Sequence, residues 1–216
     1  MACFMLITLA NSKGGVGKTT IAVHLAVFKA QAGKMVALVD CDAQDASTRW
    51  LKELPDNIKS FSLKTADDVL EQIPAIIRDF EVVIADGPAG LSEVTRALLL
   101  LADMALLPCG PSGLDLRAAQ DAIRVVRQVQ EIRKGPPRAL LVPNKIETNQ
   151  RLSRELLATA ESLGIPHLHP IKKRTAIADS YGQGTVVWRL PGTNDITDEL
   201  NAFFIQVAEY EKEITG

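Results

Sequence analysis

The sequence has few cysteines and no CxxC pair, which argues against both a disulfide framework and a structural metal centre. Cys3, Cys41 and Cys109 are odd in number and far apart, a distribution that favours reduced thiols in a core. His167 and His169 form an isolated HxH pair with no neighbouring cysteine or carboxylate cluster. We therefore expect no zinc site of the usual ligand spacing.

The chain also lacks a later hydrophobic run long enough to span a bilayer. The longest one, residues 97–108, is too short and contains Asp103. The apolar start, residues 1–10, has no basic lead-in and no cleavage-like site, so it predicts a buried strand and not a signal peptide. We expect a cytoplasmic protein. The length of 216 residues and the absence of repeats, linkers or low-complexity tracts predict a single domain over residues 1–216.

Charge is unevenly distributed in a chain whose formal net charge is only −2. Residues 124–189 carry 12 basic and 5 acidic side chains, whereas the rest of the chain is acidic. A basic segment in an acidic protein is a candidate surface for phosphate-rich polymers, although solvated helix faces can carry the same residues without binding anything. The candidate DNA-binding residues are the densest basic cluster and two arginines one helical turn apart: Lys172, Lys173, Arg174, Arg151 and Arg154.

A glycine-rich loop follows the first apolar run and reads Asn11-Ser12-Lys13-Gly14-Gly15-Val16-Gly17-Lys18-Thr19-Thr20. Its glycines let successive backbone N–H groups converge on a polyphosphate, and the following helix adds the positive end of its dipole. Lys18 is expected to reach the β/γ-phosphates, and Thr19 to bind Mg²⁺. The predicted nucleotide-binding residues of this loop are Lys13, Gly14, Gly15, Val16, Gly17, Lys18, Thr19 and Thr20.

Lys13 is an addition to the usual phosphate-loop pattern, in which a glycine stands at the position of Ser12. Lys18 already serves the phosphates of its own chain, and a second ammonium group nearby would be repelled unless a negative charge arrived. We therefore expect Lys13 to act in trans. At this point the sequence resembles the deviant Walker A ATPases of the ParA/MinD family, whose loop reads KGGxGK[ST]. The resemblance implies an ATP-sandwiched homodimer in which Lys13 is catalytic and contacts the nucleotide of the partner.

Apolar runs alternate with amphipathic segments along the whole chain. This pattern predicts an α/β fold with one doubly wound, mostly parallel sheet flanked by helices, the architecture of P-loop NTPases. The strands are predicted at residues 4–9, 35–39, 61–63, 81–85, 104–107, 139–142 and 166–171. A helix over residues 66–79 is expected to be interrupted or restarted at Pro74. The last helix is predicted at residues 197–214.

Carboxylates follow two of the predicted strands, at the edge where open parallel sheets bind ligands. Asp86 comes directly after the apolar run 81–85, the arrangement of a Walker B metal-binding residue. Asp40 and Asp42 are two apart, a spacing that points both side chains to the same side of an extended strand end. We expect Asp40 to help organise the Mg²⁺ shell and Asp42 to orient the attacking water, with a plain surface aspartate as the alternative for Asp42. The predicted metal-binding residues are Thr19, Asp40 and Asp86.

Asn144-Lys145-Ile146-Glu147 stands at another predicted strand end, where an asparagine can read a purine ring. The segment is similar to the NKxD pattern of GTPases, but a glutamate replaces the aspartate that would bind guanine. The resemblance to the ParA/MinD family favours adenine. We therefore expect Asn144 to contact the base of ATP or ADP.

The resemblance covers nearly the whole chain and is strongest to small ParA-type members. Besides the loop it rests on residues 39–44, where Ala43 replaces the usual proline, and on residues 86–90, 107–115 and 173–184. It implies an ATPase that binds nucleoid DNA nonspecifically and positions a plasmid or another cargo. Hydrolysis is expected to be slow alone and stimulated by a ParB-like adaptor, because neither switch carboxylate supplies a cationic group for the transition state.

Two other classes share the loop. A MinD-like membrane-cycling ATPase needs a basic amphipathic C-terminal helix, but the last helix here has an acidic polar face. We expect its apolar side to pack against the core and not to bind a membrane. A reductase of the nitrogenase iron-protein type needs paired cysteines for an iron–sulfur cluster, and Cys109 is the only cysteine after Asp86. We therefore reject that class.

Overall fold

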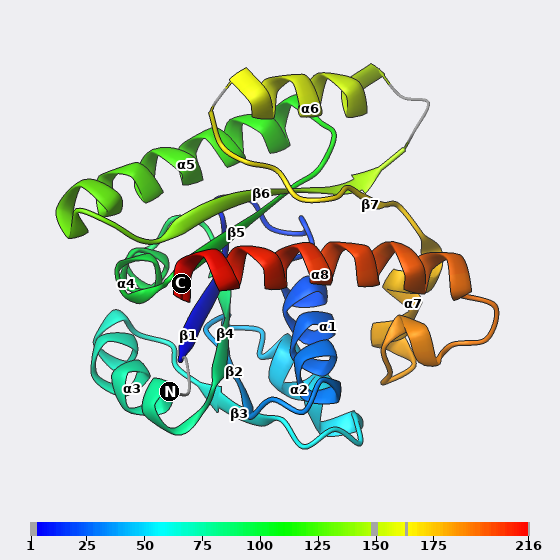
Figure 1. Ribbon diagram of the computed structural model, residues 1–216, viewed down its shortest axis with the longest axis horizontal. Coiled ribbons are helices and arrows are strands. Elements are labelled where there is room, and N and C mark those ends of the chain that lie inside the picture. The colour runs from blue at the N-terminus through cyan, green and yellow to red at the C-terminus, as the bar shows by residue number, and fades with distance from the viewer. Residues whose placement is uncertain (1–3, 148–150, 163, 216) are drawn as a thin grey trace.

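The computed structural model describes residues 4–147, 151–162 and 164–215. Its seven strands form one sheet in the order β3-β2-β4-β1-β5-β6-β7, and each neighbouring pair runs parallel (Figure 1). The strands are β1 (Met5–Asn11), β2 (Val36–Asp40), β3 (Lys59–Ser62), β4 (Val82–Ala89), β5 (Met104–Cys109), β6 (Arg138–Ile146) and β7 (Ile171–Lys172). The predicted α/β fold class with a parallel sheet is confirmed.

Helices cover both faces of the sheet (Figure 1). One layer holds α1, α2, α7, η1 and α8, and the opposite layer holds α3 to α6. Their bounds are α1 (Lys18–Gln31), α2 (Ala46–Glu53), α3 (Ala66–Asp79), α4 (Glu93–Leu101), α5 (Gly113–Arg133), α6 (Arg151–Ser162), α7 (Thr175–Gly182), η1 (Val187–Arg189) and α8 (Asn194–Thr215). None of these helices, within the residues described, is both long and apolar enough to cross a membrane.

The strands β1, β2 and β5 are buried at every residue. Their sequences are near-continuous apolar runs because helices cover both faces of a parallel sheet and exclude water from both. β3, by contrast, is a short edge strand whose residues are exposed or half-buried. The strands β2, β4 and β1 are neighbours in the sheet and run parallel. The polar loops that follow them therefore lie side by side at the carboxyl ends of the strands.

The C-terminal helix packs on the sheet as predicted. Leu200, Phe203, Phe204 and Val207 of α8 are buried, and the rings of Phe203 and Phe204 lie 5.2 Å apart. Full burial of a side chain of this size stabilises the fold by about 1.5–3 kcal/mol. The apolar side of α8 is therefore part of the core and is not available to a bilayer.

Two local expectations were wrong. Pro74 does not interrupt α3, because Val69, Ile73 and Ile76 bury the helix against the core on both sides of the proline. The strand predicted over residues 166–171 is reduced to β7 and an isolated bridge at His167, since the prolines of that segment have no N–H to donate. The helix α7 was not predicted.

Candidate nucleotide-binding site

The glycine-rich loop joins β1 to α1 in the conformation that the sequence predicts. Gly15 and Gly17 have φ of 74° and 100°, in the left-handed region that favours glycine. A Cβ at Gly17 would also lie 2.3 Å from Asn144 Nδ2. The N-cap residue of α1 is Gly17, which has no side chain to cap the helix, so the N-terminal N–H groups and the helix dipole face the loop.

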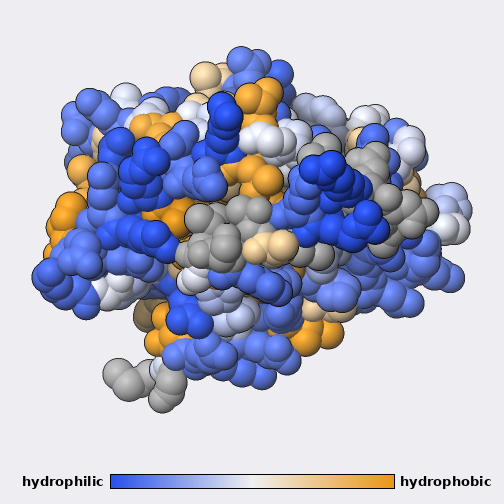
Figure 2. Space-filling view, turned by 90° about the horizontal axis from the view of Figure 1, so that it is seen from above, coloured by the Kyte–Doolittle hydropathy of each residue, from blue (hydrophilic) through white to orange (hydrophobic). Residues whose placement is uncertain are grey.

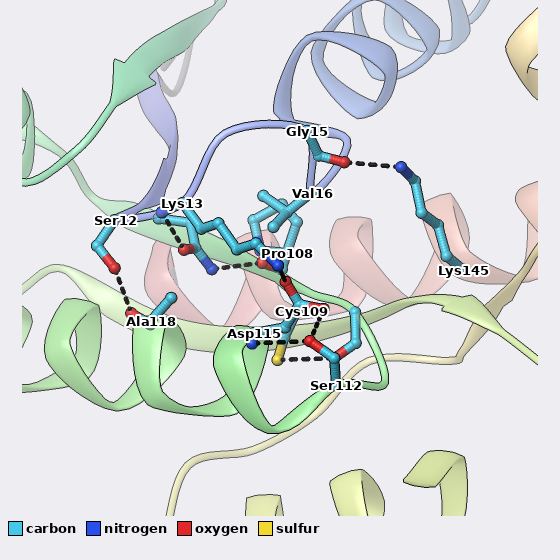
Figure 3. Close-up of polar contacts among 12 residues, drawn as sticks. Ser12, Lys13, Gly15, Val16, Pro108, Cys109, Ser112, Asp115, Ala118 and Lys145 are labelled. Carbon is cyan, nitrogen blue, oxygen red and sulfur yellow. Dashed lines mark hydrogen bonds and ion pairs between the residues drawn. The ribbon is translucent and has the colours of Figure 1, made fainter. Parts of the chain in front are cut away.

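Side chains from β6 hold this loop from outside. The amide nitrogen of Asn144 donates to the carbonyl of Val16 at 2.7 Å. Lys145 Nζ donates to the carbonyl of Gly15 at 2.7 Å (Figure 3). Lys18 Nζ donates to the carbonyl of Lys13 at 3.1 Å. The strand predicted over residues 139–142 extends to Ile146 as β6, so Asn144 lies within it. The side chain of Asn144 contacts the glycine-rich loop. Its expected contact with a purine stays a prediction.

Lys13 has a partner inside its own chain. Its Nζ lies 2.7 Å from Asp115 Oδ1, at the start of α5, and Ser112 Oγ donates to the other oxygen of Asp115 (Figure 3). Burial alone would raise the pKa of Asp115, but the bonds from Lys13 and Ser112 outweigh it and hold that pKa below its ordinary value. The premise that a second subunit must supply the negative charge for Lys13 is therefore wrong, because Asp115 of the same chain supplies it.

Asp86 is a buried carboxylate, and neither of its oxygens has a hydrogen-bond partner among the described residues. Burial raises its pKa to about 7, and the charge of Asp40 adds to the shift, while the nearby hydroxyls of Thr19 and Ser47 counteract it. Unsatisfied buried oxygens of this kind are destabilising unless a cation binds them. Carboxylate and hydroxyl oxygens are ligands that Mg²⁺ prefers, so Asp86 and Thr19 fit this ion.

Asp40 stands beside Asp86 in the register of β2 and β4, but its oxygens are occupied. Oδ1 accepts from the backbone N–H of Asp42 and from Lys64 Nζ, both at 3.1 Å. Oδ2 accepts from Ser47 Oγ at 2.7 Å and from the backbone N–H of Thr48 at 2.9 Å. A direct metal bond would displace one of these donors. The expected role of Asp40 in the Mg²⁺ shell stays a prediction.

Asp42 connects two of the polar loops at this edge. Its Oδ1 accepts from the N–H of Gln44 at 2.9 Å, and its Oδ2 accepts from the N–H of Ala89 at the end of β4 at 3.3 Å. The side chain also lines the cavity that contains the glycine-rich loop. Asp42 is thus placed on the same cavity wall as Lys18 and Thr19, as its predicted role requires.

The cavity has a volume of about 630 Å³, within the range of small-molecule sites. It is lined by the glycine-rich loop and Asp42, and also by apolar side chains of β7, α7 and α8, among them Ile171, Ile177 and Phe204. Such a lining offers polar groups for phosphates and apolar surface for a base.

The predicted DNA-binding cluster lies on the rim of this cavity, and acidic side chains pair with each of its members. Lys172 pairs with Glu199 at 3.2 Å, Lys173 with Glu147 at 2.9 Å, and Arg174 with Asp195 at 3.3 Å. These ion pairs neutralise much of the charge that the sequence count assigned to the segment. A DNA contact here would have to compete with them.

The second predicted pair lies on α6. Arg151 pairs with Glu155 at 2.6 Å, while Arg154 is exposed. The neighbouring α5 adds exposed arginines at positions 117, 124 and 127. Figure 2 shows this side of the molecule, on which hydrophilic residues surround smaller hydrophobic patches.

Sequence reasoning missed Asp115, Ser47 and Lys64, which contact the loops of the site from other elements. The prediction of reduced thiols in a core is confirmed for Cys41 and Cys109, which are buried and free. Cys3 lies outside the described residues. Within the part of the chain that the structure describes, no cluster of histidine, cysteine and carboxylates could hold a metal by itself. A cation at Asp86 would therefore also need oxygens from a ligand or water.

The parallel sheet, the glycine-rich loop and the buried carboxylate define a P-loop nucleotide-binding protein. The chain belongs to the family described as "CobQ/CobB/MinD/ParA nucleotide binding domain", which matches residues 7–187. It is therefore an ATP-binding NTPase of the ParA/MinD group. The predicted family is confirmed.

Individual relatives cover almost the whole chain. Maintenance of carboxysome distribution protein A (McdA) from Halothiobacillus neapolitanus is 30% identical over 210 residues, which cover 93% of this chain and 95% of that protein. The ATP complex of a McdA variant from Cyanothece has a TM-score of 0.80 at 17% identity and covers 95% of each chain. Cobyrinic acid a,c-diamide synthase from Mycobacterium smegmatis, with bound ADP and magnesium, has a TM-score of 0.66 at 24% identity, covering 83% of this chain and 91% of that one.

Proposed function

We propose that this protein hydrolyses ATP in order to position an intracellular cargo. The observation that carries the proposal is Asp86, a buried carboxylate with both oxygens unpartnered among the described residues, beside a phosphate loop with a second lysine. Such a site is complete only with a cation and a polyphosphate. The likeness to McdA, a protein named for the distribution of carboxysomes, supports cargo positioning as the purpose of the cycle.

The residues divide the work of phosphoryl transfer between them. The loop N–H groups and Lys18 bind the β- and γ-phosphates, while Thr19 and Asp86 hold Mg²⁺, which when bound neutralises charge on the phosphate oxygens. Asp42, which lines the same cavity, orients the attacking water. Neither Asp42 nor Asp86 supplies a cationic group for the transition state, and Asp115 of the same chain holds Lys13. Slow hydrolysis in isolation follows.

The proposed cycle has a dimeric, DNA-bound state and a monomeric, released state. ATP joins two chains when Lys13 leaves Asp115 and reaches the partner's nucleotide. The dimer binds nucleoid DNA nonspecifically, because two copies of a basic surface contact more phosphates than one. A ParB-like adaptor on the cargo then stimulates hydrolysis and releases the protein from DNA.

The proposal is tested by measuring Mg²⁺-dependent ATP hydrolysis together with the mass of the protein in solution. We expect a nonhydrolysable ATP analogue with Mg²⁺ to convert monomer into dimer, and ADP to leave the monomer unchanged. Light scattering measures this directly. A monomer mass in the presence of demonstrably bound analogue would contradict the sandwich dimer, and absence of hydrolysis with DNA and adaptor present would contradict the enzyme.

Membrane cycling has less support from the structure. The apolar side of α8 is buried, and its other side carries Asp198, Glu209 and Glu213, which anionic lipids would repel. Liposome flotation in the presence of ATP distinguishes the two cycles. A membrane-cycling ATPase should float with the liposomes, whereas a DNA-binding dimer should not.

A further inference from the structure

Lys64 lies just beyond β3, and its ammonium group binds the loop that follows β2. This β2–α2 loop, residues 41–45, carries Asp42. Lys64 Nζ donates to Asp40 Oδ1 and to the Asp40 carbonyl, each at 3.1 Å, and lies 2.7 Å from Asp45 Oδ1. It also donates to the carbonyl of Asp42. One side chain thus contacts the residue before the loop, its middle and its last residue.

The conformation of the β2–α2 loop depends on such contacts. Asp45 has a φ of 51°, a left-handed conformation that is uncommon for a residue other than glycine. Its carboxylate is held by Lys64 and by Ser62 Oγ, which donates at 3.1 Å from the end of β3. The edge strand β3 therefore anchors the loop that carries Asp42.

Lys64 also balances the charge of an acidic cluster. Asp40, Asp42, Asp45 and Asp86 lie on the β2–α2 loop and on the two strands beside it. Burial alone would lower the pKa of Lys64, but its bonds to Asp45 and Asp40 outweigh this effect and raise the pKa, so the side chain stays charged. Lys64 does not line the nucleotide cavity.

We propose that Lys64 is a positioning residue for ATP hydrolysis, which acts through the β2–α2 loop to hold the Asp42 carboxylate toward the cavity. The inference rests on the proposed ATPase function. Lys18, Thr19 and the loop N–H groups bind the nucleotide without Lys64. Loss of Lys64 should therefore affect turnover and leave nucleotide binding largely intact.

The charge of Lys64 should also affect the binding of Mg²⁺, in the direction opposite to its effect on turnover. A cation next to Asp40 disfavours another cation at the neighbouring Asp86. Removing it should tighten the binding of Mg²⁺ in the presence of nucleotide, while hydrolysis becomes slower. A residue that only supported the fold would weaken both.

The test compares Lys64→Met with Lys59→Met, which removes the same charge from an exposed position at the start of β3. We expect Lys64→Met to lower kcat by roughly 10- to 100-fold, the range for misplacing a catalytic group by about 1 Å. The dissociation constant of a fluorescent ATP analogue and the KM should change little. Mg²⁺ titration of the nucleotide complex should give a lower midpoint. Lys59→Met should match the wild type, and Lys64→Arg should recover part of the rate because it keeps the charge but not the compact ammonium geometry.

Wild-type kcat in Lys64→Met, or parallel losses of nucleotide binding and turnover, would overturn the role of Lys64 alone. Absence of hydrolysis in the wild type would instead contradict the proposed function, whatever the variant does. If circular dichroism shows that Lys64→Met does not fold, Asp45→Ala applies the same test by removing one contact. A lower kcat with unchanged nucleotide affinity then supports the proposal, and an unchanged kcat contradicts it.

Discussion

Lys13 Nζ and Asp115 Oδ1 lie 2.7 Å apart, joining the glycine-rich loop to the first turn of α5 within one chain. The lysine side chain is 42% exposed and the aspartate 12%, so the pair sits at the surface edge of the site. A lysine that acts in trans must first leave this partner. If Lys13 acts in trans as proposed, this pair therefore opposes dimerisation.

Asp115→Ala should accordingly let the protein dimerise at a lower concentration. A partly exposed ion pair is worth up to about 1 kcal/mol, and each dimer breaks two, so the shift should be several-fold. Light scattering across a dilution series with a nonhydrolysable ATP analogue measures it. Asp121→Ala, which removes the same charge from the exposed pair with Arg124 one to two turns further along α5, is the control. An equal midpoint in wild type and Asp115→Ala would count against a competing ion pair.

The two loop lysines should separate binding from assembly. Lys18→Ala should lose nucleotide binding, because Lys18 is the expected ligand of the β/γ-phosphates. Lys13→Ala should keep much of the affinity but lose dimerisation and hydrolysis. Calorimetric titration with ATP and light scattering on the same samples distinguish these outcomes. A dimeric Lys13→Ala protein would refute the action in trans.

Asp42→Ala should trap the ATP-bound dimer, because it removes the carboxylate that orients water and leaves the phosphate and Mg²⁺ ligands in place. Turnover should fall by roughly 10²-fold or more while ATP affinity is retained. Gel filtration after incubation with ATP should show a long-lived dimer, which the wild type loses as ADP accumulates. Hydrolysis at the wild-type rate would make Asp42 a bystander.

Asp86 should make the metal-free protein less stable as pH rises. Its pKa is about 7 in the folded chain and 3.8 in the reference state, so between these values the folded state binds the extra proton and unfolding releases it. The free energy of unfolding therefore falls from about pH 4 to pH 7. Asp86→Asn should lack this component, so its advantage in Tm over the wild type should grow across that window. With Mg²⁺ and nucleotide bound, the wild type should have the higher Tm. A difference in Tm that does not depend on pH would contradict the raised pKa of Asp86.

DNA binding should require ATP, show little sequence preference and weaken steeply with salt, because each neutralised phosphate releases counterions. Fluorescence anisotropy with two unrelated duplexes, in ATP and in ADP, measures this at several salt concentrations. We expect loss of binding in the triple-alanine variant of Lys172, Lys173 and Arg174, and a smaller loss for Arg151→Ala with Arg154→Ala. Because the triple cluster also borders the nucleotide cavity, ATP affinity must be shown to be unchanged in that variant. Intact DNA binding in the triple variant would move the prediction to the arginines of α5 and α6.

Much of the architecture follows from local patterns in the chain. Continuous apolar runs predict the central strands because helices bury both their faces, and the apolar residues of α8 predict its packing on the sheet. The phosphate loop can be recognised from the sequence because its left-handed glycines and the following helix N-terminus form one short segment. Pro74 was misjudged because packing of the flanking residues outweighs the local preference of a proline.

The sequence by itself therefore determined the fold class, the family and the loop that binds phosphates, all of which depend on residues close together in the chain. Tertiary structure alone decided that Asp115 holds Lys13 across 102 positions, that Lys64 binds the β2–α2 loop, and that Asp86 is left without a partner among the described residues. The order of the strands brings these groups together, with β3 beside β2 and β5 beside β1. Ion pairing and burial depend on which strands are neighbours, and spacing along the chain does not specify that.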